Sequence, residues 1–185
     1  IIAVYDDIAD YILVKQGGKI NAVGTPDKPI VMTSEKEEPG AWGGIHICGR
    51  AHTNAEGGKG SSEIGGAVYG GNDDADNSGT LQYIRLEYTG FAFDEEHEAN
   101  GISFYGVGNG TIVDHCQAYK GSDDGFEFFG GSVNVSNLVA VSCSDDSFDW
   151  TEGWNGKGTN LVAYQEDKST LGYDCDCLME CDNNG

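Results

Sequence analysis

The chain has 185 residues, of which 31 are acidic and 10 are basic, so its formal net charge is −21. This charge repels nucleic acid and anionic membrane surfaces. No apolar run approaches the roughly 18 residues that a membrane-spanning helix needs. We therefore expect neither nucleic acid nor direct membrane insertion among its interactions.

The composition favours short strands over helices. There are 29 glycines and only 3 prolines, and the β-branched and aromatic residues fall in short runs between Gly, Asn, Ser and Asp. We expect one all-β domain over residues 1–185. The chain begins with Ile-Ile rather than Met, so we also expect a fragment or processed form of a longer protein.

The first part of the chain contains four short predicted strands, within residues 12–14, 17–25, 28–34 and 42–49. Residues 50–78 are then polar and glycine-rich, without alternation. We interpret residues 50–78 as a loop excursion from a regular wall, and call this segment the excursion. Long loops of this kind often carry function.

The end of the excursion contains a candidate calcium loop, DADNSG at residues 74–79. Carboxylate and hydroxyl oxygens at alternate positions, followed by glycine, resemble the start of an EF-hand loop. Arg85 stands where that loop needs a bidentate Glu, so this is no EF-hand. A calcium site and a plain turn both remain open. The candidate ligands here are Asp73, Asp74, Asp76 and Ser78.

The second half of the chain is a repeat. SDDGFEFF at 122–129 returns 22 residues later as SDDSFDWT at 144–151, and NLVAVSC at 137–143 returns 23 residues later as NLVAYQE. Two short strands per period, separated by turn residues, predict a right-handed parallel β-helix with coils of roughly 22 residues. A chain of this length would hold about eight such coils.

Equivalent residues of successive coils stack about 4.8 Å apart. We expect the aromatic residues to form a ladder inside the bore and the acidic residues between them to point outward. The predicted inward ladder comprises Ile102, Phe126, Phe148, Phe104, Phe128 and Trp150.

Stacking turns the acidic repeat into three columns. Like charges about 5 Å apart repel, and the cost is offset by a bound cation, by hydrogen bonds from turn amides, or by a shared proton. These three remedies stay open. The columns contain Asn100, Asp124 and Asp146; Asp123 and Asp145; and Ser103, Glu127, Asp149 and Glu180. As calcium ligands we consider Asn100, Asp123, Asp124, Glu127, Asp145, Asp146 and Asp149.

Two further sets of residues bear on function. The run DEEHE at 94–98 is a solvated loop or a cover over a cation beside Asn100. Paired carboxylates also serve polysaccharide hydrolysis, for which the alternative catalytic candidates are Asp123, Asp124, Asp145 and Asp146. A complete catalytic set with histidine and a basic clamp is not evident, so we assign no catalytic residue.

The six cysteines are an even number, which fits disulfides in an oxidising compartment, and sequence does not determine their pairing. The candidates are Cys48, Cys116, Cys143, Cys175, Cys177 and Cys181.

Ordered segments along nearly the whole chain carry a resemblance to a known family: GTPDKPIVMTS, PGAWGGIHICGRA, YGGNDDADNSGTLQYIRLEYTG, NGISFYGVGNGT, DDGFEFFGGSVNV and DDSFDWTEGWNGK. The chain resembles secreted or surface-exposed right-handed parallel β-helix proteins of bacteria. The resemblance implies export and supplies no activity. The cysteine-rich stretch at 175–181 departs from the family's pattern.

We therefore expect an extracellular or cell-surface structural or binding module stabilised by Ca²⁺. Its expected partners are a second copy of itself, stacked through the open ends of the helix, or a surface glycan. Tyr105, Trp154 and Tyr173 are candidate sugar-stacking residues. A glycoside hydrolase or lyase is the alternative.

Overall fold

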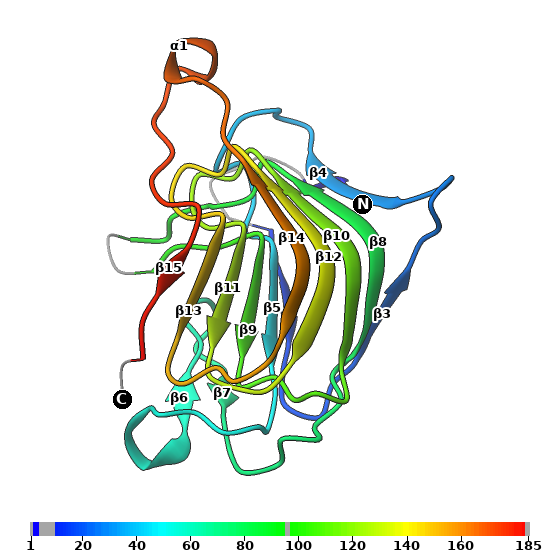
Figure 1. The fold of residues 1–185 in the computed structure, drawn as a ribbon, viewed down its shortest axis with the longest axis vertical. Helices are drawn as coiled ribbons and strands as arrows, with labels where there is room; N and C mark the ends of the chain where they lie inside the picture. Colours follow the sequence, from blue (N-terminus) through cyan, green and yellow to red (C-terminus); the bar gives the residue numbers. More distant parts are fainter. Residues whose placement is uncertain (1, 4–9, 95–96, 184–185) are drawn as a thin grey trace.

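The structure is a computed structural model that describes residues 2–3, 10–94 and 97–183. Two parallel sheets face each other along the chain (Figure 1). The seven-stranded sheet runs in the order β1 (Ile2–Ala3), β4 (Ile30–Ser34), β8 (Gly79–Glu87), β10 (Ile112–Tyr119), β12 (Asn134–Val141) and β14 (Gly158–Tyr164), with β3 (Ile20–Val23) also paired to β8. The six-stranded sheet runs in the order β15 (Glu180–Cys181), β13 (Phe148–Thr151), β11 (Phe126–Phe129), β9 (Ile102–Tyr105), β5 (Ile45–Cys48) and β2 (Ile12–Val14).

The chain alternates between these sheets, which makes it a right-handed parallel β-helix, as predicted. The register reproduces the sequence repeat, because Phe126 pairs with Phe148 and Leu138 pairs with Leu161. The four predicted N-terminal strands are present as β2, β3, β4 and β5. The described residues form fewer coils than the expected eight, since the segments between β5 and β9 use many residues outside the two sheets.

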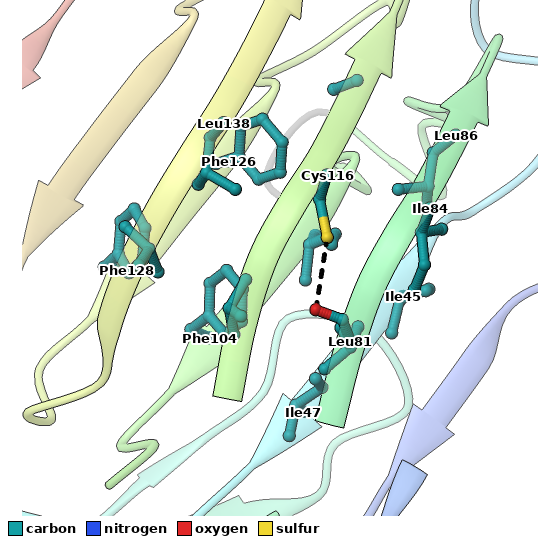
Figure 2. Close-up of a cluster of buried hydrophobic side chains, with 14 of the residues drawn as sticks. Ile45, Ile47, Leu81, Ile84, Leu86, Phe104, Cys116, Phe126, Phe128 and Leu138 are labelled. Atoms are coloured by element: carbon teal, nitrogen blue, oxygen red, sulfur yellow. Dashed lines mark hydrogen bonds between the residues drawn. The ribbon is translucent and has the colours of Figure 1, made fainter. Parts of the chain in front are cut away.

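The bore is filled by the predicted ladder of apolar side chains (Figure 2). The Phe126 and Phe148 rings stack with centroids 5.6 Å apart, and the Phe104 and Phe128 rings stack at 4.9 Å. These four side chains are almost fully buried. Burying a phenylalanine side chain contributes roughly 1.5–3 kcal/mol, so this ladder is a main source of stability.

The long strands of the seven-stranded sheet bend at one residue in each coil. Tyr83, His115, Asn137 and Asn160 lie in one column, and each has a φ between 51° and 55°. Asparagine tolerates this left-handed conformation better than most residues. The Asn160 side chain donates to Asn137 Oδ1 at 3.0 Å, so the last two residues of the column are also joined by a hydrogen bond.

The excursion is more ordered than the sequence predicts. It contains a 3₁₀ turn, η1 (Glu56–Gly58), and an antiparallel pair of strands, β6 (Gly60–Ser61) and β7 (Val68–Tyr69). Its apolar residues pack on the outer face of the six-stranded sheet in a second small core. This core comprises Cys48, Ala67, Tyr69, Tyr105 and Phe129, with Leu13 packed against it. The excursion is therefore held against the wall.

After β14 the chain forms a short helix, α1 (Lys168–Leu171), and returns to pair β15 with β13. No helix among the described residues is long and apolar enough to cross a membrane.

The disulfide prediction is not supported, because all six cysteines are free thiols. Cys48 is buried in the small core under the excursion, whereas Cys116 and Cys143 are buried in the bore. The Cys116 thiol donates to Leu81 O at 3.6 Å (Figure 2). Cys175, Cys177 and Cys181 lie in the more exposed C-terminal segment.

Candidate cation-binding site

A pocket of about 200 Å³ opens on the outer face of the six-stranded sheet. We call it the acidic pocket, because all the residues that line it carry carboxylates. They are Glu63, Glu98, Asp123, Asp124, Glu127, Asp145, Asp149 and Glu180. Five of these residues belong to the predicted calcium ligands.

Strand register builds the floor of the pocket. Ser103 pairs with Glu127, Glu127 with Asp149, and Asp149 with Glu180, so these side chains share one column. Their neighbours along each strand point into the bore, because side chains alternate between the two faces of a strand. The predicted third column is therefore present, and it includes Glu180.

The rim comes from two segments outside the coils. Glu63 belongs to the excursion and accepts a hydrogen bond from Tyr105 Oη at 3.2 Å. Glu98 belongs to the DEEHE run and lines the pocket, so this end of the run lies next to the acidic columns. Residues 95–96 of the run lie outside the described part of the chain. The sequence carries no sign that Glu63 reaches this pocket, because no period links the excursion to the coils.

The column of Asn100, Asp124 and Asp146 is satisfied by turn amides. The backbone N–H of Asp124 donates to Asn100 Oδ1 at 3.1 Å, and that of Asp146 donates to Asp124 Oδ1 at 2.9 Å. The N–H of Cys177 donates to Asp146 Oδ1 at 2.8 Å. Each side chain thus accepts a hydrogen bond from the equivalent turn one coil further on. Hydrogen bonds from turn amides were one of the three ways expected to offset the repulsion between the stacked acids.

These amide bonds do not neutralise the pocket. Burial raises the pKa of Asp124 to about 9 and that of Asp123 to about 8, and neighbouring carboxylates add to both shifts. Burial likewise raises the pKa of Glu63 to about 7 and places that of Glu127 well above its usual range. Asp149 is less affected, with a pKa raised by burial to about 6. Metal-free, the pocket therefore holds several carboxyl protons at neutral pH.

No lysine or arginine lines the described pocket. His46 lies in the same column as Ser103, but it is fully buried and stacks against Tyr105 with ring centroids 6.3 Å apart. Burial lowers the pKa of His46 to about 4, so its ring is neutral at pH 7. The protein supplies little positive charge here.

The structure contains three overlapping groups of three carboxylates. Within each group, one oxygen from each residue lies within 4.8 Å of the others. The groups share Asp124 and Asp149, so they form a continuous row. Oxygen donors at this spacing suit Ca²⁺, which takes six to eight oxygens in an irregular shell. The groups are Asp123, Asp124 and Asp145; Asp124, Glu127 and Asp149; and Asp146, Asp149 and Glu180.

The predicted loop at 74–79 lies apart from these groups. Asp74 Oδ1 contacts His52 Nδ1 at 2.8 Å, and Asp76 Oδ2 accepts a hydrogen bond from Ser78 Oγ at 3.0 Å. Asp73, Asp74 and Asp76 belong to none of the three carboxylate groups among the described residues. The side-chain oxygens of Asp74 and Asp76 thus have protein partners, and a cation at this loop stays an untested prediction.

The three aromatic residues proposed for sugar stacking are not free surface rings. Tyr105 is fully buried. Trp154 stacks on Phe128 with ring centroids 4.5 Å apart, and the Tyr173 hydroxyl donates to Ser142 O at 2.7 Å. All three residues instead pack the wall or its end.

These features define an acidic β-helix protein with a carboxylate pocket on its outer wall. Family comparison then matches residues 1–185 to the pectate-lyase like beta helix domain, and the chain belongs to this family. Searches of curated proteins and of solved structures return no match.

Proposed function

We propose that the protein is an extracellular or cell-surface β-helix module that binds Ca²⁺ in the acidic pocket. The observation that carries this proposal is the convergence of eight carboxylates, several of them buried, with no lysine or arginine lining the described pocket. Buried like charges need neutralisation, and a divalent cation supplies it without protons.

Calcium in this pocket would bind coils to one another. Asp124 and Glu127 come from the β11 coil, Asp149 from the β13 coil and Glu180 from β15. An ion between them joins segments that are far apart in sequence and binds the folded state only. Calcium is thus proposed as a structural element.

The proposed location agrees with this role. Extracellular calcium-binding modules have dissociation constants of about 10⁻⁴–10⁻³ M. A partly open site with ligands from several segments is compatible with an affinity in this range. The acidic surface also disfavours nucleic acid and anionic membranes as partners.

Thermal unfolding tests this proposal. At a calcium concentration about 100 times the dissociation constant, stabilisation is about 2.7 kcal/mol, or a rise of roughly 5–10 °C in Tm for a domain of this size. We expect this rise when Ca²⁺ replaces EGTA, and we expect Glu127→Gln combined with Asp149→Asn to abolish it. The matched control, Glu56→Gln combined with Asp27→Asn, changes two exposed carboxylates outside the pocket and should respond like wild type. An unchanged wild-type Tm contradicts the proposal.

A polysaccharide-active enzyme is the second candidate, favoured by the spread of pKa values in the pocket. With a pKa of about 9, Asp124 keeps its proton at neutral pH, whereas Asp149, at about 6, is mostly ionised. Such a pair is what general acid and base catalysis uses. The family description also names pectate lyases.

Assays on neutral and uronate polysaccharides, with and without Ca²⁺, separate the two candidates. The enzyme predicts product that disappears in Asp124→Asn combined with Asp149→Asn. Folded, calcium-responsive protein that releases no product across the panel favours the structural module.

A further inference from the structure

The dipeptide Asn-Gly occurs at residues 100–101, 109–110, 155–156 and 184–185, and the last of these lies outside the described residues. In the other three dipeptides the fold requires the glycine. A Cβ atom on Gly101, Gly110 or Gly156 would lie between 1.9 and 2.6 Å from a backbone oxygen of another segment. Close packing of the wall therefore places a glycine directly after three asparagines.

Asparagine followed by glycine carries an intrinsic chemical reaction. The backbone nitrogen of the glycine loses its proton and attacks Cγ of the asparagine, which forms a C–N bond and releases the side-chain nitrogen as ammonia. Water then opens the resulting succinimide ring at either carbonyl and yields aspartate or isoaspartate. Glycine favours this reaction, because it has no Cβ atom and adopts backbone conformations that other residues avoid. The reaction needs a free glycine N–H, an unbound asparagine side chain and access to water.

Asn100 meets none of these conditions. Its side chain is buried, with Oδ1 accepting from the Asp124 N–H at 3.1 Å and Nδ2 donating to Ser103 Oγ at 3.0 Å. The N–H of Gly101 donates to Asp124 O at 2.9 Å. Ring closure would break all of these hydrogen bonds inside the wall, so the fold protects this asparagine.

Asn109 meets only part of them. Its side chain is exposed in a turn. The N–H of Gly110, which supplies the attacking nitrogen, donates to Asp76 O at 3.1 Å, and the N–H of Asn109 donates to Asp74 O at 2.8 Å. The Gly110 nitrogen must therefore leave its acceptor before it can react.

Asn155 meets all three conditions. Its side chain is exposed and makes no hydrogen bond to any described residue. The N–H of Gly156 likewise has no acceptor among the described residues. The backbone N–H of Asn155 donates to Gly131 O at 3.0 Å, but this group takes no part in the ring that forms.

We propose that Asn155 is a site of spontaneous deamidation in the folded protein, and that the fold protects Asn100 and Asn109 from the same reaction. The modified residue lies in the turn between β13 and β14 and does not line the acidic pocket. The proposal therefore goes beyond calcium binding and does not depend on it.

The product changes the turn in two ways. Either product adds a negative charge to a chain whose formal charge is already −21. Isoaspartate also lengthens the main chain by one atom just before Lys157. The N–H of Lys157 donates to Asn134 Oδ1 at 3.0 Å, and its carbonyl oxygen accepts from the Val135 N–H at 2.9 Å. The modification thus disturbs the contacts that hold the start of β14 against β12, and we expect aged protein to have a lower Tm.

Peptide mapping by mass spectrometry tests this ranking. Folded protein is incubated in EGTA at mildly alkaline pH, and the aspartate and isoaspartate products of each site are separated by chromatography. We expect Asn155 to convert roughly tenfold faster than Asn109, a factor equivalent to about 1.4 kcal/mol, because the Gly110 N–H must first leave its acceptor. Asn100 should stay intact. In urea-unfolded protein the three sites should convert at similar rates.

Two matched variants complete the test. Asn155→Gln should remove the fast product and the fall in Tm on ageing, because glutamine would have to close a larger ring. Asn109→Gln also changes an exposed asparagine before glycine and should age like wild type. A folded protein in which Asn155 converts no faster than Asn109 overturns the proposal. So does the same ranking in urea, which would assign the difference to neighbouring residues in the sequence. Since all samples contain EGTA, failure here is distinguishable from failure of the calcium proposal.

Discussion

Asp124 Oδ1 accepts a 2.9 Å hydrogen bond from the backbone N–H of Asp146, which is its own equivalent one coil further on. The repeat in the sequence is therefore a repeat of turns, in which each carboxylate holds the next turn in place. The same turns place Asp123, Asp124 and Asp145 in the lining of the acidic pocket. One motif thus serves both the wall and the candidate site.

Substitutions at Asp124 separate these two roles. In EGTA at pH 7, Asp124→Ala leaves the buried N–H of Asp146 without an acceptor, and we expect a loss of about 1–3 kcal/mol. Asp124→Asn keeps an acceptor and resembles the protonated acid, so its metal-free stability should stay near that of wild type while its calcium response weakens. Urea unfolding with and without Ca²⁺ measures both quantities. Equal stability of the two variants in EGTA would show that this hydrogen bond does not contribute to the free energy of unfolding.

The metal-free protein should be most stable in acid. Folding raises the pKa of Asp149 to about 6, Glu63 to about 7, Asp123 to about 8 and Asp124 to about 9. A carboxyl whose pKa is higher in the folded state contributes stability that is full below its unfolded pKa, near 4, and is lost as pH rises through the folded value. We therefore expect unfolding free energy in EGTA to fall between about pH 4 and pH 9.

Saturating Ca²⁺ should flatten this fall, because the ion replaces protons as the neutralising charge. Urea titrations at a series of pH values, in EGTA and in Ca²⁺, provide the measurement. Metal-free stability that rises from pH 4 to pH 8 is incompatible with a pocket of buried carboxyls.

The bend in the long strands gives a prediction that is independent of the pocket. Asn137 has φ = 54°, donates to Asp114 Oδ1 at 2.8 Å and accepts from Asn160. Asn137→Ala should cost about 1–3 kcal/mol through left-handed strain and lost hydrogen bonds. Asn137→Gly removes the strain and should cost less. Urea unfolding in Ca²⁺ compares the two variants, and an alanine variant as stable as the glycine variant would argue against strain at this bend.

Thiol labelling tests the state of the cysteines. Burial raises the pKa of Cys116 and Cys143 to about 12 and that of Cys48 to about 11, so these thiols should react only after unfolding. The exposed Cys177 and Cys181 should react in the native protein. Denatured, unreduced protein should give six reactive thiols, as a reduced control does. Four or fewer would reveal a disulfide.

Much of the fold follows from residues close together in the sequence. The alternation in FEFF and FDWT places aromatics in the bore and Glu127 and Asp149 outside, and the period of about 22 residues sets their register. The acidic columns were predictable for the same reason, since each depends on a constant spacing along the chain.

Features that depend on contacts between distant segments were not predictable. Glu63 reaches the pocket through the fold of the excursion, which packs Tyr69 and Ala67 against Tyr105. The exposure of Tyr105 was misjudged, because the same packing covers it. The cysteines suggested disulfides by number alone, whereas the structure distributes them between the core and the C-terminal segment.

The most direct test of the calcium proposal is a crystal structure of the protein grown in Ca²⁺, with anomalous scattering data from a second crystal in which Tb³⁺ replaces calcium. We expect an anomalous peak in the acidic pocket, within bonding distance of oxygens from Asp124, Glu127 and Asp149. A well-ordered pocket at saturating metal that contains no such peak, with its carboxylates paired directly with one another, would contradict it.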